Sequence, residues 1–95
     1  MSREFSANGI EIESDGRVVW VNDPTGCCIG RFSKNGVDVH RTGPEQVELG
    51  TQCLDCFHEG NPAEQWDRFV SSMKTHHGVD VSARHRPKFV GGIGS

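Results

Sequence analysis

The chain has 95 residues, a hydrophobic share of 34% and a formal net charge of −3. A chain of this length is typical of one domain with one small core, so a bound metal ion or partner would change its stability appreciably. The acidic balance gives no bulk reason to expect nucleic acid or an anionic membrane as a partner. No stretch approaches the ~18 apolar residues that a membrane-spanning helix needs, so we expect no membrane contact.

The charges are unevenly distributed along the chain. Residues 1–67 carry five Lys or Arg against twelve Asp or Glu, whereas residues 68–95 carry five against one. The simplest interpretation is that the two parts neutralise each other within the fold or between protomers. The alternative is a phosphate-binding patch formed by Lys74, His76, Arg84, Arg86 and Lys88. We do not favour it, because we expect no aromatic side chains interleaved with these residues and no nucleic-acid-binding motif accompanies them.

The first residues contain no apolar segment of the kind that a secretory signal has. We therefore expect a cytoplasmic protein in which all four cysteines stay reduced. Residues 1–90 are expected to form a single small domain, and the glycine-rich residues 91–95 a flexible tail.

Residues 9–41 predict an antiparallel meander of about four strands. Apolar and polar residues alternate on both sides of residues 14–16, which read Ser-Asp-Gly and predict a hairpin loop. With all three residues in the loop and Gly16 left-handed, the core face holds Ile10, Ile12, Val18 and Trp20. A loop of two residues, Asp and Gly, would instead move Trp20 to the exposed face.

A second hairpin is expected over residues 27–41, with Asn35-Gly36 as a two-residue type I′ turn. In that register Phe32 faces Val39, and Cys28 lies on the same side of the sheet as Phe32. Residues 43–60 show no clear periodicity and are expected to be a connection. Residues 79–82 could add a short C-terminal strand.

Residues 62–77 predict an amphipathic helix. Asn61 is a favoured N-cap, Pro62 suits the first helical position, and Gly78 stands where helices commonly end in a left-handed residue. Glu64, three residues after the cap, completes a capping box. An apolar stripe at spacings of three and four would pack on the meander, and it consists of Ala63, Trp66, Phe69, Val70, Met73 and His77. The predicted fold class is therefore α+β.

The other face of the sheet is expected to be open to solvent. A small α+β domain without a deep cleft favours a binding or accessory module that acts by contact and without catalysis. A protein partner is the first expectation, and free edge strands could also join a second protomer in a homodimer. The residues expected to form the contact surface are Glu11, Arg17, Val19, Val21, Arg31 and His40.

Cys53 and Cys56 form a CxxC pair, which predicts half of a structural zinc site as the first alternative. Zinc needs two further ligands, of which His58 is the nearest in the chain. The fourth would come from Cys27, Cys28, His40, His76 or His77, and the candidate set is Cys53, Cys56, His58 and Cys28.

The cysteines of the chain also fit two other interpretations. They could be buried structural thiols that hold no cofactor, because free cysteine is among the most buried residue types. They could also serve a thiol-dependent enzyme, with Cys27 near His40 or Cys56 near His58. A catalytic CxxC ordinarily opens a helix, whereas this pair precedes the helix N-cap by five residues. No phosphate-loop or hydrolase motif is present, so catalysis is not expected.

Overall fold

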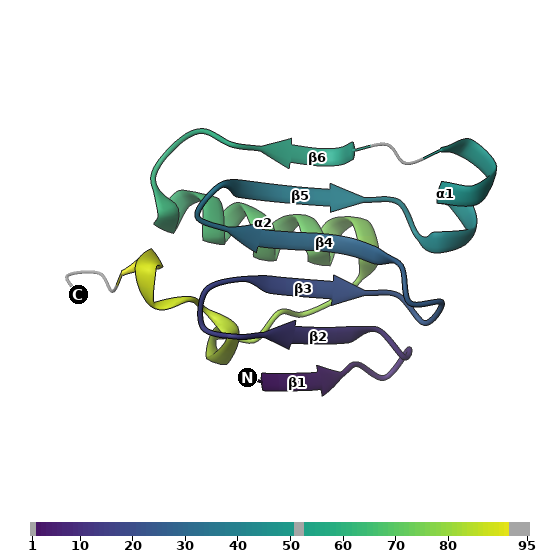
Figure 1. The fold of residues 1–95 in the computed structure, drawn as a ribbon, viewed down its shortest axis with the longest axis horizontal. Helices are drawn as coiled ribbons and strands as arrows, with labels where there is room; N and C mark the ends of the chain where they lie inside the picture. The colour runs from purple at the N-terminus through teal and green to yellow at the C-terminus, as the bar shows by residue number, and fades with distance from the viewer. Residues whose placement is uncertain (1, 51–52, 92–95) are drawn as a thin grey trace.

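The computed structural model describes residues 2–50 and 53–91 and shows one antiparallel sheet with a long helix across one face (Figure 1). Within these residues six strands lie in chain order: β1 (Ser2–Phe5), β2 (Glu11–Ser14), β3 (Val19–Asn22), β4 (Cys28–Ser33), β5 (Gly36–His40) and β6 (Cys53–Phe57). The helical elements are α1 (Gly43–Leu49), α2 (Pro62–His77) and the short 3-10 helices η1 (Ala83–His85) and η2 (Lys88–Val90). The predicted α+β class is confirmed. No helix in the described ranges is long and apolar enough to cross a membrane.

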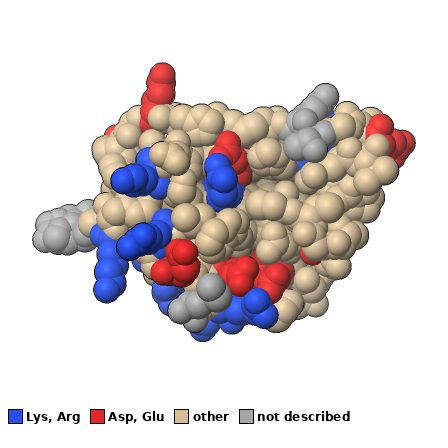
Figure 2. Space-filling view, in the orientation of Figure 1, with Lys and Arg blue, Asp and Glu red and all other residues tan. Residues whose placement is uncertain are grey.

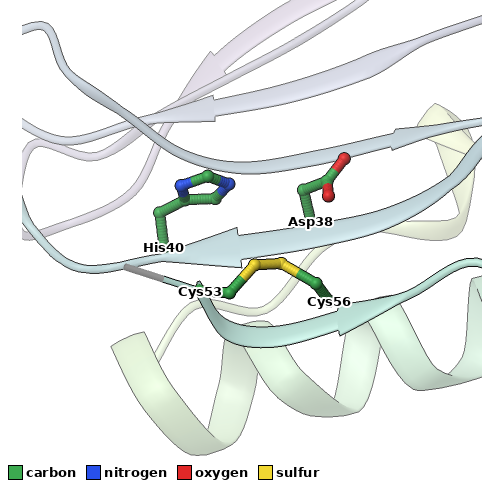
Figure 3. Close-up of side chains that lie close together, drawn as sticks. All are labelled: Asp38, His40, Cys53 and Cys56. Carbon is green, nitrogen blue, oxygen red and sulfur yellow. A yellow bond between two sulfur atoms is a disulfide. The ribbon is translucent and has the colours of Figure 1, made fainter. Parts of the chain in front are cut away.

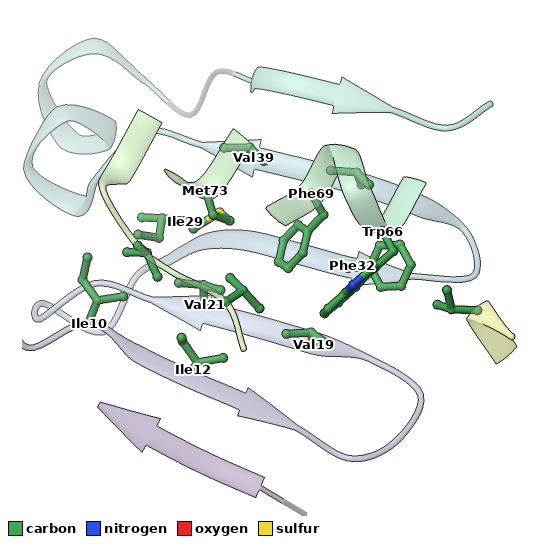
Figure 4. Packing of buried hydrophobic residues seen from close by; sticks show 14 residues of the cluster. Ile10, Ile12, Val19, Val21, Ile29, Phe32, Val39, Trp66, Phe69 and Met73 are labelled. Carbon is green, nitrogen blue, oxygen red and sulfur yellow. The ribbon is translucent and has the colours of Figure 1, made fainter. Parts of the chain in front are cut away.

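The core lies between the sheet and α2 (Figure 4). Phe32 is at its centre, with ring centroids 5.2 Å from Trp66 in an edge-to-face contact and 5.7 Å from Phe69. Gly30 makes room for the helix, since a Cβ at that position would lie 2.5 Å from Sδ of Met73. The strand side of the core is completed by Ile10, Ile12, Val19, Val21, Ile29, Val37 and Val39.

The helix α2 begins and ends where the sequence predicts. The side chain of Asn61 accepts a hydrogen bond from the backbone N–H of Glu64 at 2.9 Å. Gly78 ends the helix in the left-handed conformation with φ 66°. Both signals depend on contacts between close neighbours in the chain.

The predicted register of the first hairpin is wrong. Ile12 pairs with Val21 and Ser14 with Val19, so the loop holds the four residues 15–18. The carboxylate of Asp15 extends the turn because its Oδ1 accepts hydrogen bonds from the backbone N–H of Arg17 and of Val18, each at 2.9 Å. Val19 and Val21 therefore lie in the core, and Trp20 lies on the open face.

The second hairpin is also shifted. Phe32 pairs with Val37, and the turn consists of Lys34 and Asn35. A type I′ turn needs positive φ at both central residues, but Asn35 has negative φ and only Gly36, at 126°, is positive. Because the register shifts by two residues, the side chains near this turn stay on the faces that the sequence predicts. A bulge opposite the pair Val21/Asn22 breaks the alternation, so Cys28 turns to the open face and not to the side of Phe32.

The region beyond residue 42 contains more structure than the sequence predicts. Residues 43–60 include α1 and the edge strand β6, and residues 79–82 form no strand although Val79 and Val81 are buried. The N-terminal edge strand β1 was not predicted either. Of the expected flexible tail, residues 92–95 lie outside the described residues.

Candidate metal centre on the open face

The open face carries charged side chains in rows that cross the strands (Figure 2). Arg31 of β4 contacts the neighbouring Asp38 of β5, with Nη2 3.4 Å from Oδ2. At the far edge Arg3 of β1 contacts Glu11 at 2.8 Å and Glu13 at 3.1 Å. The paired residues of one complete row are Arg3, Glu13, Trp20, Arg31, Asp38 and Cys56.

A β-bulge in β6 brings Cys53 and Cys56 to the same face. In a regular strand residues three apart point to opposite faces. Here Asp55 pairs with Val39 and Cys53 with His40, so Leu54 is the extra residue of the bulge. The two cysteines form a disulfide, with Cα atoms 5.8 Å apart. The expectation that all four cysteines are reduced is therefore wrong for this pair, whereas Cys27 and Cys28 are free thiols.

Two side chains of β5 lie beside this pair (Figure 3). Asp38 and His40 are two residues apart on a strand, so both project from the same face as the cysteines. One potential ligand atom from each of Asp38, His40, Cys53 and Cys56 lies within 4.8 Å of the others. Cysteine thiolates, an imidazole nitrogen and a carboxylate oxygen are all zinc ligands, so the two cysteines could join such a site once the disulfide is reduced.

His58 lies beside this cluster and contacts one of its members. Its Nε2 is 2.9 Å from Oδ1 of Asp38, while Arg31 lies near the other carboxylate oxygen. The carboxylate of Asp38 is thereby oriented from two sides. Contacts of this kind hold metal-ligating carboxylates in place in metalloproteins.

An open depression of about 570 Å³ adjoins the cluster, and α1 forms one of its walls. The helix is anchored by Asp23, whose buried carboxylate accepts hydrogen bonds from the backbone N–H groups of Gly43 and of Cys27. Burial alone would raise the pKa of Asp23, but hydrogen bonds from Thr25, Gly43 and Cys27 lower it overall. The depression is lined by Cys27, Cys28, Arg31, Asp38, His40 and Gln46.

The remaining thiols and imidazoles do not join the four-atom cluster within the described part of the chain. Burial raises the pKa of the Cys28 thiol, which makes it a poor nucleophile at neutral pH. Cys27 shares the depression with His40, as one enzyme interpretation requires. His77 lies on the helix side, where its Nε2 is 2.8 Å from the backbone oxygen of His40 and burial lowers its pKa.

The candidate zinc set is only partly brought together. Cys53 and Cys56 are in the cluster, but His58 and Cys28 lie beside it, and His40 and Asp38 take their places. The ligand set expected from the sequence contains only cysteine and histidine and so lacks Asp38, although the spacing of Asp38 from His40 on a strand indicates a shared face.

The residues expected to form a contact surface lie in three different places: the open face, a turn and the core. Glu11, Arg31 and His40 lie on the open face, whereas Arg17 lies in the β2–β3 turn. Val19 and Val21 have no exposed surface and cannot contact a partner. A contact role for the others stays a prediction.

Comparisons of the chain with protein family models, with curated proteins and with solved structures find no match. The cluster of four potential ligands is the arrangement with the most specific chemistry in the described residues.

Proposed function

We propose that this protein is a small metal-binding domain that holds one Zn²⁺ between β5 and β6. The observation that carries the proposal is the convergence of Asp38, His40, Cys53 and Cys56, whose ligand atoms lie within 4.8 Å of one another. Zinc sites in proteins are typically tetrahedral, and two thiolates with an imidazole and a carboxylate suit its borderline-soft character. The ligands come from adjacent strands, so one ion would join the edge strand to the sheet.

Metal binding and the Cys53–Cys56 disulfide exclude each other. The disulfide takes up two electrons and two protons from a dithiol reductant, which becomes a disulfide itself, and yields two thiols. Both protons pass to solvent when the thiolates bind the ion. At a Zn–S distance of about 2.3 Å the two sulfurs of a tetrahedral site stand about 3.8 Å apart, so the thiol side chains must rotate apart. The proposed function therefore belongs to the reduced protein.

A bound ion would matter for the stability of so small a domain. Among the described residues β6 is an edge strand that pairs with β5 alone, and its Leu54 and Phe57 pack against the core. A ligand present at about 1,000 times its Kd stabilises the folded state by about 4 kcal/mol. Such a contribution is comparable with the whole stability of a marginal domain.

The test is native mass spectrometry of the reduced protein with and without zinc, alongside thermal melting. We expect one Zn²⁺ per chain and a higher melting temperature, and a chelator should reverse both. Cys53→Ser should abolish stoichiometric binding, whereas the matched control Cys28→Ser, on the same face but outside the cluster, should retain it. A reduced protein that stays metal-free at excess zinc and melts unchanged would refute the proposal.

A further inference from the structure

A second surface lies at the end of the sheet that holds the β2–β3 and β4–β5 turns. The chain returns to this end after α2, so that η1 and η2 lie beside the two turns (Figure 1). Lys and Arg side chains gather there in the space-filling view (Figure 2). Three adjoining hollows lie at this end of the sheet, and we call the surface that they form the basic end. The hollows are lined by five basic residues, which are Arg17, Lys34, Arg84, Arg86 and Lys88.

Positive charge is concentrated at the basic end. Among the described residues Asp15 is the one acidic residue that lines the three hollows, so the net charge of the basic end is +4 while the whole chain has −3. Arg84 lies 4.0 Å from Glu4, and Arg86 donates a hydrogen bond to the backbone oxygen of Gly91 at 2.7 Å, so among the described residues Arg17, Lys34 and Lys88 remain for an external anion. Local positive potential of this kind attracts polyanions even to an acidic protein.

The tertiary structure rearranges the basic patch considered from the sequence. Arg17 and Lys34, which lie in turns, belong to the basic end, whereas Lys74 and His76 of the predicted patch do not line its hollows. Lys74 lies in the last turn of α2, where its Nζ is 3.0 Å from Asp80. The neighbouring His77 contacts His40, at the end of β5 opposite the β4–β5 turn.

An aromatic ring is placed among the cations. Phe89 of η2 is half-buried and lines two of the three hollows, one with Arg17 and Lys34 and another with Arg17 and Lys88. Its ring stacks on Phe32 of the core, with centroids 5.6 Å apart and an interplanar angle of 9°, so the core holds the ring in place. The exposed Asn35 lines the same hollow and adds a hydrogen-bonding side chain.

We propose that the basic end binds single-stranded nucleic acid, with phosphates on the Lys and Arg side chains and a base against Phe89. Stacking aromatics beside a basic groove are typical of single-strand binding, because every base has a face that can stack. The hollows extend from the β4–β5 turn to Ser2 of β1, which is about 15 Å at the usual strand spacing and suits a few nucleotides. This inference is independent of the proposed zinc site.

The test is fluorescence anisotropy with a labelled oligo(dT) of about 8 nucleotides and a duplex of the same length. If three phosphates are contacted, affinity for the single strand should fall about 20-fold between about 50 and 200 mM salt. Arg17→Gln, Lys34→Gln and Lys88→Gln should each reduce the slope of log K against log salt by about 0.7. Lys74→Gln is the matched control and should leave the slope unchanged, because Lys74 lies away from the basic end.

The stacking part of the proposal is tested by Phe89→Leu, which keeps an apolar contact with the core. We expect a 5- to 150-fold loss of affinity, which is the range that corresponds to the loss of one stacked base. The slope of log K against log salt should stay unchanged, because no phosphate contact is removed. Circular dichroism and melting check that this variant is folded. Absence of binding by the wild-type protein at about 50 mM salt, tighter binding of the duplex, or an equal effect of Lys74→Gln would overturn the proposal. An unchanged affinity in Phe89→Leu would overturn the assignment to single strands.

Discussion

Arg68 of α2 binds the carboxylate of Asp55 on β6 through two of its nitrogens, with Nε 3.1 Å and Nη2 2.9 Å from Oδ1. Ser72, one turn further along the helix, donates a hydrogen bond to Oδ2 of the same carboxylate. The guanidinium of Arg68 also lies 4.5 Å from the ring centroid of Phe57. These contacts tie the edge strand to the helix from the face opposite the cysteines.

The first prediction concerns Asp55→Asn and pH. The hydrogen bond from Arg68 lowers the pKa of Asp55 below its ordinary value of 3.8. The stabilisation is therefore fully present above that ordinary value and is lost as the pH falls through the lower value of the folded state. At pH 7 the variant should lose on the order of 1 kcal/mol of unfolding free energy, since solvent screens the half-exposed Arg68.

Urea unfolding of both proteins at neutral and at strongly acidic pH measures this effect. The difference between them should shrink as acid protonates Asp55 in the wild-type protein. Asp80→Asn is the control, because the Lys74–Asp80 pair is exposed and should contribute nothing measurable. A difference that is independent of pH would contradict the assigned role of the charge.

The second prediction compares two glycines of positive φ. At Gly36, with φ 126°, a Cβ would lie 2.7 Å from the backbone oxygen of Phe57, whereas at Gly16, with φ 91°, it would meet nothing within 4 Å. Gly16→Ala should therefore cost only the left-handed strain of about 1–2 kcal/mol. Gly36→Ala adds a steric clash with β6 and should cost at least about 1 kcal/mol more. Equal losses in denaturant unfolding would mean that β6 moves aside freely.

The third prediction concerns Asp23→Asn and the position of α1. The Oδ1 of Asp23 accepts hydrogen bonds from Thr25 and Cys27, and its Oδ2 accepts one from the backbone N–H of Gly43. The amide oxygen of an asparagine can still accept the hydrogen bonds from Thr25 and Cys27. Its NH₂ group cannot accept the hydrogen bond from the N–H of Gly43, so the start of α1 should be destabilised by about 1–3 kcal/mol. Hydrogen exchange should become faster in residues 43–49 and stay unchanged in the β3–β4 turn. Uniform acceleration across the sheet would contradict this local role.

The fourth prediction separates His40 from His58 as a zinc ligand. In the reduced protein His40→Ala removes a ligand atom and should lower zinc affinity far more than His58→Ala, which removes only a contact to Asp38. Loss of such an outer contact typically costs 10- to 100-fold in affinity. Competition with a chromophoric chelator gives both values. A larger loss in His58→Ala would restore the ligand set expected from the sequence.

The sequence by itself determined the helix α2 and the face that it buries. Asn61, Glu64 and Gly78 act on neighbours within one or two turns, so their side chains and backbone preferences specify the ends of the helix locally. The apolar stripe with Trp66, Phe69 and Met73 has the same local basis. The presence of two hairpins could also be read from turn residues.

Only the tertiary structure decided the registers and the candidate site. Asp15 selected a four-residue loop through its own hydrogen bonds, and this choice moved Val19, Trp20 and Val21 to the other faces. The CxxC pair shares a face with His40 only because a bulge at Leu54 forms when β6 pairs with β5. Such pairing joins residues far apart in the chain, so the free energy that selects it comes from the assembled sheet and core, and no local pattern records it.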